Sequence, residues 1–193
     1  MAAARTRLEP DVRREEILSA AREVFSECGY SSASMGQVAE RAGVARGLVN
    51  HYFGAKRDLY LAVVVDLASE LPLIVRTDLT DLPVEEMVER NLDRFLDAVE
   101  RDHALWSILL GSGAAERDPE VARIVSAARD EVVERMAANH AGPAAGEELR
   151  LALRAFLGAA MAASGEWLVQ GRASREQVQA LLRRTLLALT AAR

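Results

Sequence analysis

The sequence is poor in residues and segments on which several protein classes depend. Its 193 residues include one cysteine, Cys28, so an internal disulfide is excluded and a reducing cytoplasm is expected. The N-terminal stretch MAAARTRLEPDVRREE lacks the apolar core of a signal peptide. The longest uncharged runs, 104–115 and 155–165, are shorter than the roughly 20 residues that cross a bilayer. We therefore expect a soluble cytoplasmic protein without a membrane partner.

The motifs of common enzyme classes are also missing. The sequence has no nucleophile elbow, no phosphate-binding glycine loop and no H-E-x-x-H motif. His103 and His140 have no companion three or four residues away of the kind that a metal site uses. The Glu-Glu pairs that begin at Glu85 and Glu147 are better explained as charges at helix N-termini than as catalytic carboxylates. The sequence thus predicts no enzyme activity, no metal and no cofactor.

Positive charge is scarce overall but unevenly distributed. The net charge of −5 argues against a protein that coats nucleic acid without selection. Residues 1–57 nevertheless hold nine Arg or Lys and seven Asp or Glu, whereas residues 58–193 hold fifteen and twenty-two. A slightly basic head on an acidic body indicates that a polyanion binds at the N-terminal end.

Half of the residues are apolar, and their spacing is helical almost everywhere. We expect an all-α protein of about nine helices. The expected segments are a first helix that ends at Gly29, and others at about 34–42, 45–52, 56–69, 84–99, 105–109, 118–132, 153–168 and 174–189. The stretch PLIVRTDLTDLP (72–83) contains two prolines and several turn-forming residues, so it is predicted to be a linker.

Two of the short helices predict a helix-turn-helix. MGQVAERA and ARGLVNHY are joined by a tight turn that contains Gly43, and Ser34 with Gln37 forms a capping-box pattern at the start of the first. The second helix can enter the major groove of B-DNA, where arginine pairs with guanine and asparagine with adenine. The candidate DNA-binding residues are Ser34, Ala45, Arg46, Gly47, Leu48, Asn50, His51, Tyr52 and Lys56. Lys56, the only lysine, begins the next helix, where a phosphate is favoured.

These residues resemble the DNA-binding domain of TetR-family transcriptional regulators over about residues 11–65. The marks are the Phe25…Gly29-Tyr30 helix end, the Ala39…Ala42-Gly43-Val44 turn, the early Gly47 and the Tyr52-Phe53-x-x-Lys56 exit. Asn50 stands where the family more often has a tyrosine that holds the phosphate backbone, which leaves Asn50 between a base and a backbone contact. The middle, 71–145, is similar only in being helical.

The resemblance implies three parts: an N-terminal arm (1–10), a helix-turn-helix domain (11–57) and a ligand-binding and dimerisation domain (58–193). The arm is either disordered or reaches the minor groove through Arg5 and Arg7. The ending EWLVQGRASREQVQALLRRTLLAL resembles the last two helices of the family, which usually form the four-helix bundle of a homodimer.

A second feature favours a dimer. Between Ala155 and Gly165 the eighth helix has no charged side, which indicates burial all round. Either it lies at the centre of one protomer, or one face meets the core and the other meets a second subunit. We favour the second interpretation, because so short a chain has few helices to cover both sides. The candidate interface residues are Ala159, Ala163, Leu182 and Leu186.

The C-terminal part is also rich in large apolar side chains, which suit a small-molecule site. The candidate ligand-binding residues are Met87, Phe95, His103, Trp106, Leu110, Met136, Phe156, Met161 and Trp167, with His103, Ser107, Asn139 and Ser164 as candidate polar anchors. Three functions follow. The first is a dimeric repressor that a small apolar ligand releases from a palindromic operator. The second is a DNA-binding regulator whose C-terminal domain meets only protein. The third is a helical enzyme, which nothing in the sequence supports.

Overall fold

The computed structural model describes residues 10–101, 118–141 and 145–191. Within these ranges the chain forms eight α-helices and one 3-10 helix, and it contains no strand. The prediction of an all-α protein is thus confirmed. The predicted helix at 105–109 and the first nine residues of the predicted arm lie outside the described residues.

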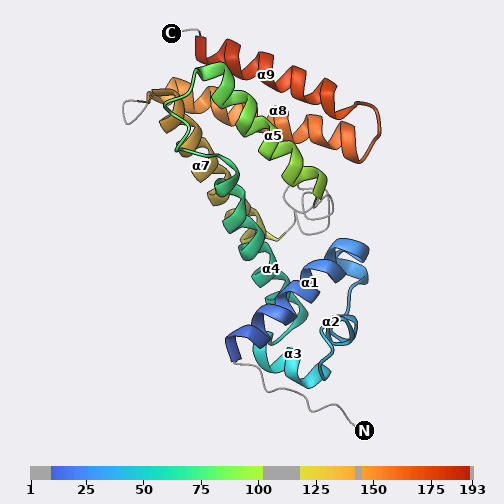
Figure 1. Ribbon diagram of the computed structural model, residues 1–193. Coiled ribbons are helices and arrows are strands. Elements are labelled where there is room, and N and C mark those ends of the chain that lie inside the picture. Colours follow the sequence, from blue (N-terminus) through green and yellow to red (C-terminus); the bar gives the residue numbers. More distant parts are fainter. Residues whose placement is uncertain (1–9, 102–117, 142–144, 192–193) are drawn as a thin grey trace.

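The helices divide into a head and a body (Figure 1). Their bounds are α1 Pro10–Ser32, α2 Met35–Arg41, α3 Arg46–Phe53, α4 Lys56–Glu70, η1 Leu71–Ile74, α5 Val84–Arg101, α7 Pro119–Ala141, α8 Glu147–Leu168 and α9 Arg175–Ala191. The head consists of α1, α2, α3 and the start of α4, and the body contains the remaining helices. The sequence therefore predicted the order of the described helices correctly.

Local signals set the ends of the short helices in the head. Ser34 caps α2, because its hydroxyl accepts a hydrogen bond from the Gln37 amide at 3.2 Å. In a full capping box the Gln37 side chain would also accept a hydrogen bond from the Ser34 amide. Here the Ser34 hydroxyl donates to Gln37 Oε1 instead, at 2.9 Å. Gly43 (φ 64°) and Gly54 (φ 71°) adopt the left-handed backbone conformation that glycine tolerates best. They turn the chain sharply after α2 and after α3, and so fix the direction of α3.

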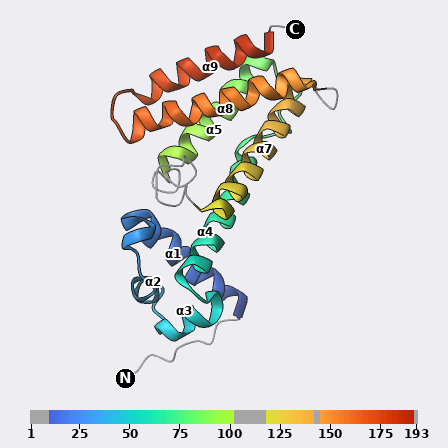
Figure 2. The same cartoon turned by 180° about the vertical axis from the view of Figure 1, so that it is seen from behind.

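The helix α4 joins the head to the body as one continuous rod and lies beside α7 (Figures 1 and 2). Its buried face includes the predicted positions Leu59, Val63 and Leu67. On the head side, Arg22 of α1 pairs with Asp66 at 2.8 Å and with Glu70 at 2.6 Å. The boundary expected between residues 57 and 58 falls inside the first turn of this helix. The orientation of the head therefore follows that of α4.

In the body, α8 and α9 form an antiparallel hairpin, with α7 packed against α8 and α5 against α9 (Figures 1 and 2). The core between them includes the fully buried Leu96, Leu153 and Leu182. The predicted capping box at the start of α9 is confirmed: the Gln177 amide donates to Ser174 Oγ at 3.3 Å, and the Ser174 amide donates to Gln177 Oε1 at 2.8 Å.

The stretch 72–83, predicted to be a linker, does connect α4 to α5 and contains no α-helix, but it is also part of the wall of the body. Pro72 in η1 and Leu79 after it are buried. Backbone carbonyl groups from 73 to 76 accept hydrogen bonds from side chains of α5 and α7: Arg94 donates to Leu73 and Ile74, Arg135 to Val75, and Asn139 to Arg76. The donors lie 20 to 63 residues further along the chain, where local sequence patterns cannot reveal them.

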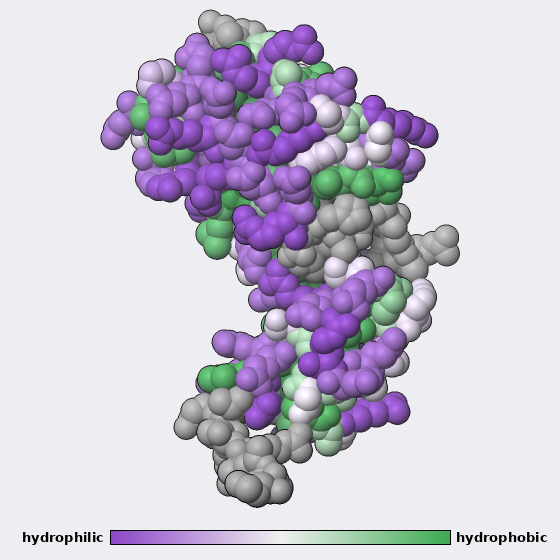
Figure 3. Space-filling model, turned by 45° about the vertical axis from the view of Figure 1, so that its right-hand side comes forward, coloured by the Kyte–Doolittle hydropathy of each residue, from purple (hydrophilic) through white to green (hydrophobic). Residues whose placement is uncertain are grey.

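The face of the body shown in Figure 3 is mostly hydrophilic. Ion pairs such as Arg90 with Glu86 and Arg150 with Glu134 lie on the helix surfaces. None of the described helices is long and apolar enough to cross a membrane.

Candidate DNA interface and ligand cavity

The helix α3 turns its apolar side chains inward and its polar side chains outward. Val49 and Phe53 are buried in the head, whereas Arg46, Asn50 and His51 are exposed. Ala45 and Gly47 are exposed as well, Leu48 and Tyr52 are half-buried, and Ser34 is exposed at the start of α2. The exposed face of α3 thus carries Arg46, Gly47, Asn50 and His51, with the half-buried Leu48 and Tyr52 at its edge.

The arginines around α3 differ in their charge partners. Arg41 at the end of α2 pairs with Glu23 and with Glu27, both at 2.8 Å. Arg46 forms no ion pair with any side chain of the described part of the chain. An exposed cation without a carboxylate partner can meet an anion without breaking an existing pair, so Arg46 is better placed than Arg41 for DNA.

Lys56 is held at the start of α4 by two groups of the α1 end. Its Nζ donates to the Ser31 carbonyl at 3.2 Å and lies 4.7 Å from the centre of the Tyr30 ring. The carboxylate of Asp58 accepts a hydrogen bond from the Ala55 amide at 3.0 Å, which satisfies one of the free donors at this helix start. The ammonium group is therefore held against the end of α1.

Sequence reasoning missed the role of Tyr30 in positioning this lysine. The ring of Tyr30 lies 4.7 Å from that of Tyr60, which in turn meets Phe25 edge-on at 5.1 Å. Burial raises the pKa of Tyr60 to about 12, so its hydroxyl stays protonated at neutral pH. The pattern Gly29-Tyr30 was visible in the sequence, but its contact with Lys56 depends on the packing of α1 against α4.

A second contact that the sequence did not reveal joins the head to the body. Arg57 Nε donates to Asp118 Oδ2 at 2.9 Å, and its Nη2 contacts Asp118 Oδ1 at 3.1 Å and Glu120 Oε2 at 2.9 Å. These hydrogen bonds to Arg57 hold the pKa of Asp118 below its usual range. These contacts of Arg57 tie the first turn of α4 to the start of α7.

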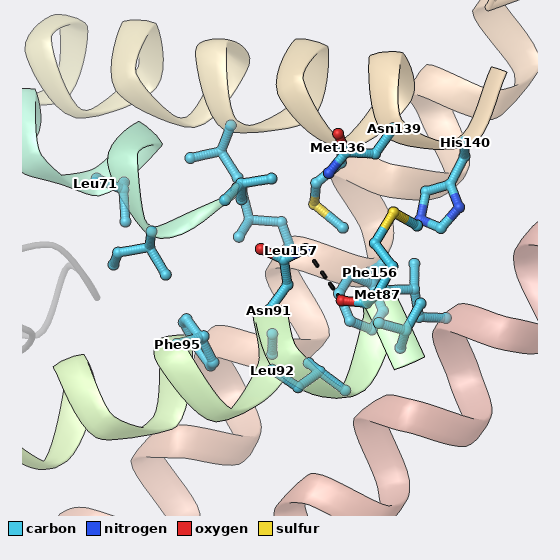
Figure 4. Close-up of a pocket in the computed structure, with 16 residues that line it drawn as sticks. Leu71, Met87, Asn91, Leu92, Phe95, Met136, Asn139, His140, Phe156 and Leu157 are labelled. Carbon is cyan, nitrogen blue, oxygen red and sulfur yellow. Dashed lines mark hydrogen bonds between the residues drawn. The ribbon is translucent and has the colours of Figure 1, made fainter. Parts of the chain in front are cut away.

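The body contains a small cavity between η1, α5, α7 and α8 (Figure 4). Its free volume is about 60 Å³. Of the candidate ligand-binding residues, Met87, Phe95, Met136 and Phe156 line it, and so does the candidate anchor Asn139. The sequence did not predict the wall from η1, because Ile74 belongs to the stretch predicted to be a linker and Leu71 directly precedes it.

Other candidate ligand residues lie elsewhere. Met161 is buried beside a groove between α7 and α8, and Trp167 packs half-buried against the core, so neither lines the cavity. Ser164 is buried, and its hydroxyl donates to the Ala160 carbonyl at 2.8 Å, which makes it a structural group rather than an anchor. His103, Trp106, Ser107 and Leu110 lie outside the described residues.

The eighth helix is not buried all round in the single chain. Ala155, Gly158, Ala159 and Ala162 are exposed on it, and two larger apolar side chains, Leu151 (65% exposed) and Val169 (55%), extend this surface. We call these six residues the open face of α8. Between Ala155 and Ala162 it carries no charged side chain, the exposed Arg154 and Glu166 flank this stretch on the helix, and nothing in the described chain covers it.

The four candidate dimer residues fall into two groups. Ala159 belongs to the open face of α8, and Ala163 is half-buried. Leu182 (1% exposed) and Leu186 (4%) are buried in the protomer, and Leu186 lines the cavity. The expectation for these two leucines needs correction, because their side chains point into the core of their own subunit. On α9 it is Leu181, 46% exposed, that faces outward.

Comparison with known proteins decides the family. The family model described as bacterial regulatory proteins, tetR family, matches residues 17–63, and that described as tetracyclin repressor-like, C-terminal domain, matches residues 84–189. The chain belongs to the TetR family of transcriptional regulators. The relatives that the comparison found are transcriptional regulators.

Two curated TetR-family relatives show how far the sequence similarity extends. The transcriptional activator FasR of Mycolicibacterium smegmatis is 33% identical over 125 residues, which cover 64% of this chain and 57% of FasR. A regulator BetI of Escherichia coli is 37% identical over 81 residues, or 42% of this chain and 41% of BetI. The matched part thus spans about half the length of these relatives.

Solved structures of transcriptional regulators, one of them described as tetR-family, share the fold. A regulator from Streptomyces coelicolor is 23% identical with a TM-score of 0.85, over 95% of this chain and 82% of the other. FadR of Bacillus subtilis, solved in complex with stearoyl-CoA, is 19% identical with a TM-score of 0.70, over 93% and 98% of the two chains. At these identities the comparison supports the fold alone.

Proposed function

We propose that this TetR-family regulator is a dimeric repressor that leaves a palindromic operator when a small, mostly apolar molecule enters the cavity of the body. The exposed face of α3, with Arg46, Asn50 and His51, is the observation that carries the proposal, and Lys56 is held in place at the start of the next helix. Arg46 contacts a base edge in the major groove, while Lys56 and Tyr52 hold phosphates.

The open face of α8 supports the dimer. Two copies that pair through this face about a two-fold axis bury its alanines and leucine, and they present two α3 helices to the two halves of a palindrome. The small residues at 155, 158, 159 and 162 let the partner helix approach closely.

The apolar cavity supports the small-molecule ligand over the alternative, a body that binds only a protein partner. Its free volume of about 60 Å³ is well below the ~300–1,000 Å³ of pockets that enclose drug-sized ligands. A ligand of that size therefore binds only when the surrounding helices move apart. FadR, which shares the fold, was solved in complex with stearoyl-CoA, a ligand with a long apolar chain.

The wall of the cavity connects it to the DNA-binding head. Leu71 and Ile74 belong to η1, which follows α4 directly, and α4 continues into the head. A ligand that displaces η1 therefore shifts α4 and changes the spacing of the two heads in the dimer. The effect on DNA affinity equals the difference in ligand affinity between the two arrangements.

The test has two stages. Genomic fragments that the protein enriches from a random pool define the operator, and a metabolite library is then screened for release of that operator. A true inducer binds more weakly when operator is saturating, by the factor with which it weakens DNA binding, which for a coupling of ~1–3 kcal/mol is about 5- to 150-fold.

Two outcomes would contradict parts of the proposal. If no fragment is enriched, the protein is not a selective DNA binder. If ligands fill the cavity with equal affinity in the presence and absence of operator, they do not act as inducers, and the protein-partner alternative gains support.

A further inference from the structure

Ion pairs divide the arginines of the head into two groups. Four of them are held by carboxylates: Arg13 by Glu16, Arg22 by Asp66 and Glu70, Arg41 by Glu23 and Glu27, and Arg57 by Asp118 and Glu120. Within the described residues, Arg14 and Arg46 form no ion pair. Arg46 already belongs to the candidate DNA interface, which leaves Arg14 as a cation without an assigned role.

The aromatic ring at the end of α3 positions Arg14. The side chain of Arg14 is exposed, and its Cζ lies 5.0 Å from the centre of the Phe53 ring. Phe53 is the last residue of α3 and is itself buried, so it is a firm support. Stacking on a ring leaves a guanidinium its charge and its N–H donors in the plane of the group. The Arg14 guanidinium is therefore held beside α3 and still able to bind an anion.

The start of α1 lies beside α3, at the end of the head that is farthest from the body (Figures 1 and 2). The major groove of B-DNA is about 12 Å wide and a helix with its side chains measures about 10–12 Å, so the groove admits one helix at a time. When α3 occupies the groove, α1 stays outside it, next to the sugar–phosphate backbone. A cation at the start of α1 then meets phosphates rather than base edges.

Arg14 and Lys56 lie near opposite ends of α1. Lys56 contacts Tyr30 and Ser31 at the end of this helix. Gly29, the residue before them, follows Arg14 by fifteen positions, which corresponds to a rise of about 22 Å along a helix. At this separation the two cations cannot hold the same phosphate.

We propose that Arg14 is a further DNA contact of this TetR-family regulator and binds a phosphate at the edge of the major groove that α3 enters. The inference rests on the proposed placement of α3 in the groove and adds a second backbone contact, distant from that of Lys56. Because every DNA sequence presents the same phosphates, Arg14 contributes affinity and not selectivity.

The salt dependence of DNA binding tests the proposal with the full-length protein. Arg14→Gln removes the charge and keeps a long polar side chain over the Phe53 ring. One lost phosphate contact should lower the slope of log K against log salt by about 0.9 and weaken binding about five- to tenfold at about 0.1 M salt. The loss should be equal for an enriched operator fragment and for a duplex of mixed sequence.

Three further variants assign the effect to a contact. Arg14→Lys keeps the charge and should retain the slope of the unaltered protein. Arg13→Gln is the matched control: it changes the net charge equally at the neighbouring arginine, whose partner is Glu16 at 2.7 Å, and should leave the slope unchanged. Arg14→Gln combined with Lys56→Gln should lower the slope by about two, because distant contacts are additive.

The possible results separate this inference from the proposed function. An unchanged slope in Arg14→Gln, with or without a lower melting temperature, means that Arg14 only packs on Phe53, and it overturns the inference. An equal decrease in Arg13→Gln also overturns it, because net charge alone then explains the effect. Both results leave the proposed function standing, provided that the unaltered protein binds its operator. If the unaltered protein enriches no DNA fragment, the proposed function fails, and the placement of α3 on which the inference rests fails with it.

Discussion

Two cations near α3 differ in how the chain holds them. Arg46 projects from the exposed face without an ion pair among the described residues, whereas Lys56 is fixed by the Ser31 carbonyl and the Tyr30 ring. A free guanidinium can form the two parallel bonds that recognise a guanine edge. A fixed point charge at a helix start suits a phosphate, whose position on the duplex does not depend on the sequence.

These roles predict different consequences of substitution. Arg46→Ala should weaken operator binding by ~1–3 kcal/mol and relax specificity at one position of each half-site. Lys56→Ala should weaken binding to all sequences and reduce the slope of log K against log salt by about one. The measurement is the affinity for the operator and for single-base variants of it at several salt concentrations.

The matched control is Arg90→Ala, which removes an exposed arginine of α5 that pairs with Glu86. It should leave both affinity and salt slope unchanged. Uniform weakening of all DNA sequences by Arg46→Ala would make Arg46 a phosphate contact, and the assigned roles would have to be exchanged.

At the scale of helices, the open face of α8 bears on the two interpretations that the sequence left for this helix. The run from Ala155 to Gly165 lacks charge, and this pattern indicates burial, yet four of its positions are exposed in the single chain. In the proposed dimer the partner subunit covers these four positions. The sequence pattern is thus consistent with the assembly rather than with the isolated protomer.

A charged substitution on this face should disrupt the assembly. Ala159→Glu places a carboxylate in the proposed seam, where it would be desolvated without a partner, so the variant should sediment as a monomer at micromolar concentration and bind operator poorly. Ala138→Glu, at an exposed alanine of α7, is the control and should remain dimeric. Sedimentation of the unaltered protein as a monomer would end the dimer proposal.

The helix boundaries that the sequence predicted correctly depend on local chemistry. Ser34 and Ser174 cap helices through bonds to residues three positions away, and Gly43 and Gly54 bring about the turns by themselves. The wall at 72–83 could not be predicted, because its carbonyl groups are satisfied by Arg94, Arg135 and Asn139 from distant helices. The cavity could not be predicted for the same reason, because this wall forms part of its lining.

At the scale of the whole molecule, head and body are linked at both ends of α4. Its C-terminal end continues into η1 and the cavity wall, and its N-terminal end is tied to α7 through Arg57, Asp118 and Glu120. Because α7 also lines the cavity with Met136 and Asn139, both links join the head to helices of the cavity wall.

Removal of the arginine link should reduce the coupling between ligand and DNA. In Arg57→Ala, an inducer should lower operator affinity by a smaller factor than in the unaltered protein, while the melting temperature changes little, because the pair is exposed and such pairs contribute little to stability. Operator affinity with and without inducer is the measurement, and Arg90→Ala again serves as the control. Arg57→Ala could instead weaken DNA binding and leave unchanged the factor by which the inducer lowers operator affinity. Arg57 would then be a DNA contact and not a link between head and body.

The same pair predicts how coupling depends on pH. The folded-state pKa of Asp118 is lowered, so the contribution of the pair is fully present above the ordinary aspartate pKa and is lost only as pH falls through the lower folded value. As far as this link is concerned, the factor by which the inducer lowers operator affinity should therefore stay constant between about pH 5 and pH 8. A decrease already at about pH 6 would point to a histidine instead.

The sequence contains a single lysine, and the structure places it where a phosphate is proposed to bind. Apart from the amino terminus, an amine-selective reagent thus has one target in this sequence. Acylation of that amine would remove one positive charge at the proposed DNA contact and no other lysine charge, so a single labelling event could be followed by mass and by loss of operator binding. Operator DNA should slow the labelling of Lys56 but not that of the amino terminus, which serves as an internal reference. The lysine is thus a chemical reporter of how much of the protein is bound to DNA.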